Sequence, residues 1–153
     1  MKNKKLNIED TVEKLRRTEL LLEISRKIAG LKTLEEILWC LIDFVTKELG
    51  ADRGTLFLND QETNELYSRI AQGDLTREIR ILNNVGIAGA IFMNQEGEII
   101  HDVYKDLRFN KEVDQETGYK TKNMVCCPVK TVGGETIGVI QVLNKHKGRF
   151  TRD

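Results

Sequence analysis

The chain has 153 residues, of which 40% are hydrophobic and 31% are charged, with 24 basic side chains against 24 acidic ones. About 150 residues suffice for one domain whose core needs neither disulfides nor a metal. A net charge of zero disfavours general nucleic-acid binding, which usually shows a basic surplus. No apolar run approaches the roughly 20 residues of a membrane span, and residues 1–5 are basic without the apolar stretch of a signal peptide. We therefore expect a soluble globular protein with no nucleic-acid or membrane partner.

The cysteines point to a reducing compartment. Cys40, Cys126 and Cys127 make an odd count without the spacing of a disulfide framework. The sequence therefore predicts a cytoplasmic location.

A helix is predicted over Ile8–Ala29. Its apolar residues recur every seventh position, at Ile8, Leu15, Leu22 and Ala29. A second stripe overlaps the first, at Leu21, Ile24 and Ile28. Two apolar faces predict that one packs on the domain and the other meets a second copy, which gives a homodimer. An ordinary helix that packs on its own sheet remains the alternative, because Thr11, Thr18 and Ser25 weaken the coiled-coil pattern.

A second helix is expected after a boundary near residue 30, so that residues 1–30 form a signalling helix and residues 31–153 form the domain. Gly30 is typical of a helix C-cap. Thr33 and Glu36 have the spacing of a capping box, in which each side chain bonds to the other residue's amide. Leu34 then opens an apolar helical face that ends at Gly50.

From residue 51 the apolar period changes from 3.6 to 2, which is typical of strands. Strands are predicted over 55–58, 65–71, 78–82, 97–100, 123–130 and 136–143, with a short helix over 86–93. This order favours an α+β fold with an antiparallel sheet rather than a βαβ repeat.

Residues 101–122 are mostly polar and weakly periodic. A segment of this length with little regular structure is uncommon in a compact domain and is often functional. Just before it, Gly86 and Gly89 bracket the start of the short helix. Either the glycines let a phosphate approach the amides of Ile87 and Ala88, or they allow tight packing on the sheet; spacing alone leaves both open.

The sequence offers little for catalysis. Its two histidines, His101 and His146, have no neighbours at zinc-like spacing. Cys126 and Cys127 are adjacent on a strand and so point to opposite faces. We therefore expect no metal, no cofactor and no enzymatic activity in this chain.

A series of motifs carries a family resemblance: Val85–Gly89, Asp102–Tyr104, Arg108–Asn110, Val113–Asn123, Pro128–Lys130, Gly138–Lys145 and Phe150. The series resembles GAF domains, and more narrowly the cyclic-nucleotide-binding GAF domains of phosphodiesterases and bacterial adenylate cyclases, over about residues 20–153. The resemblance implies a GAF/PAS-like central antiparallel sheet, with the N-terminal helices on one face and a ligand pocket under a lid on the other.

Asn144, Lys145 and Phe150 match part of an Asn-Lys…Phe…Asp-Glu signature of that subgroup. The family's aspartate falls four residues after the Phe, one position beyond Asp153. In the family, the Lys–Asp pair is structural, so its absence bears on stability more than on ligand contacts.

The resemblance also implies a set of ligand-binding residues: Thr55, Ala71, Gln72, Ile87, Ala88, Tyr104, Asp114, Thr117, Thr121 and Gln141. The first three would face the base, and the amides of Ile87 and Ala88 would face the phosphate. Asp114, Thr117 and Thr121 would close the lid over ribose and phosphate, while Gln141 would form the floor and Tyr104 a wall. As alternatives, Thr117 and Thr121 cap local turns and Tyr104 belongs to the core.

The implied function is a regulatory sensor that binds a cyclic mononucleotide and performs no chemistry. Some cGMP-binding members carry an aspartate where this chain has Gln72, whose amide offers both a donor and an acceptor. The sequence thus favours cAMP, with cGMP second. Binding would order the lid and control a C-terminal output domain, foremost a nucleotide cyclase such as a diguanylate cyclase.

Other functions stay open. One is a GAF module that binds no small molecule and serves dimerisation or protein interaction. Another is a GAF-fold methionine sulfoxide reductase that uses cysteine thiols. A bilin or haem sensor is a third, with His101 as its one candidate ligand.

Overall fold

The computed structural model describes residues 2–73 and 78–152, with side chains from residue 8 onward. The chain forms two compact units, residues 1–44 and 45–153. We describe each unit by itself.

The first unit holds α1 (Lys2–Ile28) and most of α2 (Leu34–Glu48). The predicted capping box of α2 is confirmed, because the Thr33 amide donates to Glu36 Oε2 at 3.0 Å and the Glu36 amide donates to Thr33 Oγ1 at 3.2 Å. Gly30 follows the end of α1 but is not a left-handed C-cap, because it has no positive φ. The end of the helix is instead closed by a hydrogen bond from the Leu31 amide to the Ile28 carbonyl, three residues before it, at 3.0 Å.

One face of α1 carries apolar side chains that are more than half exposed. Ile8, Val12, Leu15 and Leu22 are 57%, 60%, 58% and 53% exposed. Ion pairs four residues apart, such as Lys14–Asp10 and Lys27–Glu23, lie elsewhere along the same helix.

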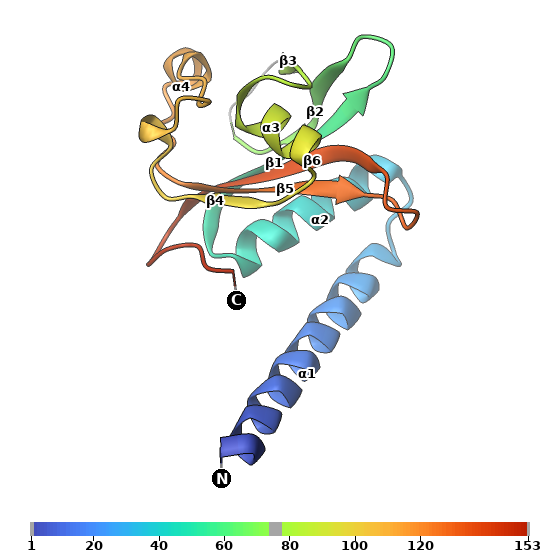
Figure 1. The fold of residues 1–153 in the computed structure, drawn as a ribbon. Coiled ribbons are helices and arrows are strands. Elements are labelled where there is room, and N and C mark those ends of the chain that lie inside the picture. The colour runs from blue at the N-terminus through green and yellow to red at the C-terminus, as the bar shows by residue number, and fades with distance from the viewer. Residues whose placement is uncertain (1, 74–77, 153) are drawn as a thin grey trace. The chain divides into compact units, whose positions relative to one another are not determined.

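The second unit is built on a six-stranded antiparallel sheet of order β3-β2-β1-β6-β5-β4 (Figure 1). Its strands are β1 (Ala51–Asp60), β2 (Glu65–Ala71), β3 (Arg80–Leu82), β4 (Glu98–Ile100), β5 (Met124–Lys130) and β6 (Thr136–Lys145). The predicted α+β class and element order are confirmed. β1 is longer than predicted because it lies at the centre of the sheet, where β2 and β6 pair with it along almost its whole length.

The two faces of the sheet carry separate apolar clusters. Helix α3 (Gly86–Asn94) packs on one face, where Ile87 and Ile91 meet Phe57 and Val139. On the other face, Val45 and Leu49 pack with Val142 and Phe150. Strand alternation sorts the β6 side chains between the two clusters, so that Val139 belongs to the first and Val142 to the second.

We call residues 101–122 the lid. It contains only a 3₁₀ turn, η1 (Val103–Lys105), and a short helix, α4 (Glu112–Thr117), as its weak periodicity predicted. Helices α3 and α4 lie on the same side of the sheet (Figure 1). The lid and α3 therefore frame the same face.

Candidate ligand-binding pocket

A pocket of about 150 Å³ lies between the sheet, α3 and the lid. One water molecule needs only about 10–15 Å³ by the same kind of measure. The space is therefore large enough for a small organic ligand in contact with all three elements.

Most of the predicted site residues share this pocket. Its walls include Thr55, Gln72, Ile87, Ala88, Asp114, Thr117, Thr121 and Gln141. Two predicted residues are not on its wall. Ala71 stands opposite Thr55 in the β1–β2 register, and it is its neighbour Gln72 that reaches the pocket. Tyr104 is 40% exposed and turns its hydroxyl to Asp114 instead.

Further lining residues were not predicted, among them Arg53, Phe57, Arg108, Phe109, Tyr119, Met124 and Leu143. Alternation offered a signal for some of them. Arg53 and Phe57 lie two positions either side of Thr55 on β1, and Leu143 lies two positions after Gln141 on β6. Tyr119 offered none, because the lid has no period from which to read a face.

The floor of the pocket is polar. Thr55, 6% exposed, stands directly opposite Gln141 in the β1–β6 register. Gln141 in turn stands opposite Cys126 on β5 and makes a side-chain hydrogen bond with its thiol. Two hydrogen-bonding side chains thus lie together beneath the lid.

The thiols on β5 are not poised for nucleophilic chemistry. Cys126 is fully buried and Cys127 partly so, as their alternation predicted. Burial raises the pKa of Cys126 to about 12 and also raises the pKa of Cys127. Both groups therefore stay protonated at neutral pH, where reactive cysteines need the thiolate.

The oxygen of the Gln72 side chain is already hydrogen-bonded to other protein groups. Its Oε1 accepts hydrogen bonds from the Gly54 amide at 2.8 Å and from Thr46 Oγ1 at 3.1 Å. A backbone N–H can only donate, so this contact fixes which end of the amide is the oxygen. Only the NH₂ group of Gln72 is left to bind a ligand. The preference for adenine also relied on the Gln72 oxygen as an acceptor, and that oxygen is occupied.

The N-terminus of α3 faces the pocket through Gly86, Ile87 and Ala88. Val85, at its N-cap, makes no side-chain cap hydrogen bond. Gly86 has φ +73°, which favours glycine, while a Cβ on Gly89 would lie 2.7 Å from the Asn84 carbonyl carbon. The first glycine thus sets the turn, and the second permits close packing against the backbone of Asn84, as one of the two sequence interpretations expected. The approach of a phosphate to the amides of Ile87 and Ala88 stays a prediction.

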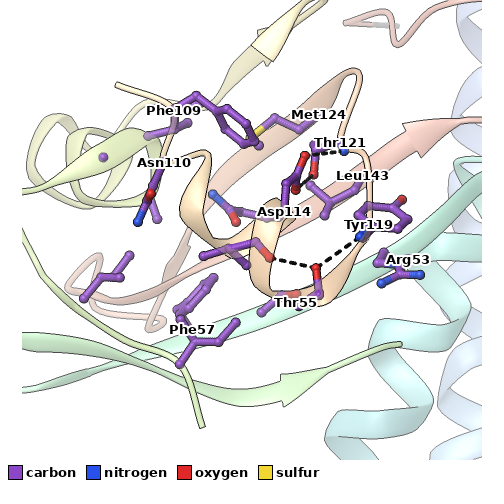
Figure 2. A pocket seen from close by; sticks show the side chains of 18 of the residues that line it. Arg53, Thr55, Phe57, Phe109, Asn110, Asp114, Tyr119, Thr121, Met124 and Leu143 are labelled. Carbon is purple, nitrogen blue, oxygen red and sulfur yellow. Dashed lines mark hydrogen bonds between the residues drawn. The ribbon is translucent and has the colours of Figure 1, made fainter. Parts of the chain in front are cut away.

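Asp114 braces the lid. Its Oδ2 accepts from the Thr121 amide at 2.7 Å, and its Oδ1 accepts from Thr121 Oγ1 at 2.7 Å (Figure 2). Its Oδ2 also accepts from the Tyr104 hydroxyl at 2.9 Å. Asp114 is only 7% exposed, so these bonds replace the water that a buried carboxylate needs. The bond from Tyr104 also raises the pKa of that phenol. The geometry makes Asp114 a positioning residue of the lid.

Thr117 forms a local turn, as the alternative interpretation expected. Its hydroxyl donates to the Val113 carbonyl at 2.7 Å and accepts from the Tyr119 amide at 3.3 Å. Gly118 follows with φ +67° and ends α4.

Asn144 holds the end of the lid to β6. Its Oδ1 accepts from the Lys122 amide at 2.6 Å, and its Nδ2 donates to the Lys120 carbonyl at 2.9 Å and to the Tyr119 hydroxyl at 2.8 Å. The next residue, Lys145, donates from Nζ to the Leu49 carbonyl at 2.6 Å, just after α2. The Asn-Lys pair of the predicted signature is therefore a structural joint.

Arg108 lines the pocket, and its guanidinium is engaged by two carboxylates. It pairs with Glu98 and Asp106, in each case at 2.7 Å from Nη2. The guanidinium lowers the pKa of both carboxyls, and they raise the pKa of the guanidinium. These groups are partly exposed, so the cluster fixes the lid position more than it stabilises the fold.

Within residues 2–73 and 78–152, no group of three or more His, Cys, Asp or Glu side chains could hold a metal ion. No helix in the same ranges is long and apolar enough to cross a bilayer.

Comparison with known proteins identifies the family. The GAF domain model matches residues 33–153, so the chain belongs to the GAF domain family. A probable 3′,5′-cyclic phosphodiesterase of Caenorhabditis elegans is 34% identical over 95% of this chain, and the match covers 22% of that protein. The dual 3′,5′-cyclic-AMP and -GMP phosphodiesterase 11 of Drosophila melanogaster is 33% identical over 90% of this chain and 10% of its own length. The chain thus spans less than a quarter of these curated relatives.

Solved structures confirm the fold. The GAF domain of a phosphoenolpyruvate-protein phosphotransferase from Coxiella burnetii superposes with a TM-score of 0.77 at 19% identity, over 88% of this chain and 81% of that one. A free methionine-R-sulfoxide reductase from Neisseria meningitidis, solved with its substrate, gives a TM-score of 0.70 at 19% identity, over 88% and 76%. Identities this low show a shared fold and leave the ligand open.

Proposed function

We propose that this GAF domain is a regulatory module that binds a cyclic mononucleotide in the pocket between sheet, α3 and lid. The observation that supports it best is the convergence of the predicted residues, all except Ala71 and Tyr104, on one pocket. The relatives are named as phosphodiesterases of cyclic nucleotides, which agrees with this ligand class.

The pocket has the parts that such a ligand needs. The uncapped N-terminus of α3 supplies amides for a singly charged phosphate. The Asp114 carboxylate accepts from Tyr104 and Thr121, and the Arg108 guanidinium donates to Glu98 and Asp106, so the α3 amides rather than either side chain are left to meet the phosphate. Phe57, Ile79 and Ile81 give the pocket apolar surface, and Thr55 and Gln141 give it a polar floor.

The base is proposed to be adenine, with guanine second. The NH₂ of Gln72 can donate to a ring nitrogen of adenine or to an acceptor of guanine, so the first choice of cAMP comes from the sequence. Because its oxygen is engaged by Gly54 and Thr46, Gln72 cannot also accept from the amino group of adenine. Direct competition between cAMP and cGMP decides the order.

Occupancy is proposed to regulate a separate output domain, with no reaction in this chain. The sequence favours a nucleotide cyclase as output, and the named relatives favour a phosphodiesterase. The unpaired cysteines agree with the expected cytoplasmic location. The exposed apolar face of α1 supports a homodimer through Ile8–Ala29.

A thermal-shift titration with cAMP, cGMP and 5′-AMP tests the ligand. A ligand at 100 times its Kd adds about 2.7 kcal/mol to the free energy of unfolding, which raises Tm by roughly 5–15 °C at this size. Thr55→Val should reduce the shift because it removes a floor hydroxyl, whereas Thr63→Val, in the exposed β1–β2 turn, should not. If no cyclic nucleotide shifts Tm, the dimerisation or interaction module becomes the better proposal.

A further inference from the structure

Arg53 is a largely buried arginine whose donors are unmatched. Its side chain is 22% exposed and lines the pocket. Its Nε is buried and has no hydrogen-bond partner among the described residues. The nearest carboxylate oxygen, Asp52 Oδ2, is 3.8 Å from Nε, which is too long for a hydrogen bond. A buried donor in this state requires an explanation.

Two other arginines of the same unit show the contrast. Arg108 donates to both Glu98 and Asp106, and Arg80 donates to Asp60, Glu65 and Glu78. Those two guanidinium groups donate to protein carboxylates. The guanidinium of Arg53 has no such acceptor among the described residues, so its N–H groups can donate to a ligand.

The guanidinium of Arg53 is held over an aromatic ring. Its Cζ lies 3.5 Å from the centre of the Tyr119 ring. The Tyr119 hydroxyl is fixed in turn, because it donates to Asp52 Oδ2 at 2.6 Å and accepts from Asn144 Nδ2 at 2.8 Å. Gly73 lies against the same guanidinium, since a Cβ there would be 2.4 Å from Nη1. Such a held fork loses little freedom when it forms a hydrogen bond.

Arg53 also lies far from the proposed phosphate end. Figure 2 shows it beside Tyr119 and Thr55, across the pocket from Phe109 and Asn110. The latter side adjoins the N-terminus of α3, because the Arg108 carbonyl would lie 3.5 Å from a Cβ on Gly86. A cyclic nucleotide with its phosphate at α3 would therefore extend its base toward Arg53.

We propose that Arg53, held over the Tyr119 ring, binds the base by donating hydrogen bonds to acceptor atoms on the edge of its six-membered ring. The assignment rests on the proposed function, and it adds a ligand-contacting residue that also joins the ligand to the lid through Tyr119. The ligand class is thus a cyclic nucleotide whose six-membered ring carries nitrogen or carbonyl acceptors.

The test compares Arg53→Met with the unaltered chain by calorimetric titration of cAMP, cGMP and a benzimidazole riboside 3′,5′-cyclic phosphate. The analogue keeps the ribose and cyclic phosphate but lacks the six-membered-ring acceptors. Hydrogen bonds from charged groups contribute about 1.5–3 kcal/mol. The variant should therefore bind the better of the two natural nucleotides about 10- to 100-fold more weakly. It should bind the analogue within about threefold of the unaltered chain, because no such bond exists to lose.

Arg80→Met is the matched control. Arg80 also lies over a tyrosine ring, that of Tyr67, with Cζ 5.2 Å from its centre, but it does not line the pocket. It should leave all three affinities unchanged, with circular dichroism confirming that both variants are folded. An equal loss of natural nucleotide and analogue in Arg53→Met would place Arg53 at the phosphate or in packing and overturn the proposal. Unchanged affinities would overturn it too, while the proposed function stands. If the unaltered chain binds none of the ligands, both proposals fail.

Discussion

At the scale of single residues, Asp114 is the group on which the lid most depends. Each of its oxygens accepts at least one bond, and the donors come from lid positions on both sides of it, Tyr104 and Thr121. One buried carboxylate thereby ties η1, α4 and the segment before β5 together. Removing its acceptor capacity should loosen all three at once.

Asp114→Asn should lower the free energy of unfolding by about 1–3 kcal/mol, because its NH₂ group would face a donor at a buried site. The lid should loosen first, so hydrogen exchange at residues 112–123 should accelerate more than exchange in β1 or β6. Tyr104→Phe is the milder comparison, since it removes one partly exposed bond and leaves both Thr121 bonds. Equal exchange rates in Asp114→Asn and the unaltered chain would show that the brace is not needed.

The side chains of the site were predictable to the extent that strand alternation or a family motif fixed them. The family resemblance implied Thr55 and Gln141, and the structure places them opposite each other in the β1–β6 register, on the pocket floor. Arg53 was not predicted, although it shares the face of Thr55, because arginine side chains are mostly exposed to solvent. Tyr119 depends on Asn144, 25 residues away in the chain, and no local pattern encodes such a contact.

At the scale of elements, the centre of the sheet has no room for a side chain at Gly138. This residue of β6 stands opposite Leu58 in the register with β1. A Cβ there would lie 2.1 Å from the Phe57 carbonyl oxygen, a backbone atom that cannot move without shifting β1. The close approach of the two strands therefore depends on glycine.

Gly138→Ala should destabilise the domain by about 3 kcal/mol or more, at the upper end of the cost of overpacking, since backbone rather than a flexible side chain must give way. Gly133→Ala is the matched control, because Gly133 lies in the β5–β6 turn without a positive φ and its nearest heavy atom would be 3.7 Å away. It should change stability by less than about 0.5 kcal/mol. Urea denaturation of both variants measures the difference, and similar midpoints would contradict the close approach.

Elements were easier to predict than their ends. The helix–helix–sheet order and the irregular lid followed from the change of period and from its loss. The ends of β1 and β3 depend on partners: β1 gains residues because strands flank it on both sides, and β3 pairs only with β2 over three positions. Sequence alone does not reveal how many neighbours a strand has.

At the scale of the whole molecule, the proposed homodimer depends on the exposed face of α1. Side chains such as Leu15 and Leu22 are more than half exposed there, and a second copy of the same helix is the partner proposed to cover them. Burial of each leucine is worth about 1.5–3 kcal/mol. Charged substitutions on this face should therefore separate the protomers without touching the pocket.

Leu15→Glu should shift the sedimentation coefficient from that of a dimer to that of a monomer at micromolar concentration. Arg16→Glu, at the adjacent exposed position, is the control for the added negative charge. Nucleotide binding should persist in Leu15→Glu, because no pocket residue lies in α1. An unaltered chain that sediments as a monomer would remove the dimer from the proposal.

The Asn144 joint gives the lid a hinge side and an opening side. Its bonds fasten residues 119–123 to the end of β6, and the adjoining Lys145 fastens that strand end to Leu49. The stretch around Lys111 and Glu112 has no such attachment to the sheet among the described contacts, although Arg108 before it is paired with Glu98 of β4. A ligand would thus enter beneath the first turn of α4, and wider opening of the lid would require the Arg108–Glu98 pair to break while the Asn144 side stays in place.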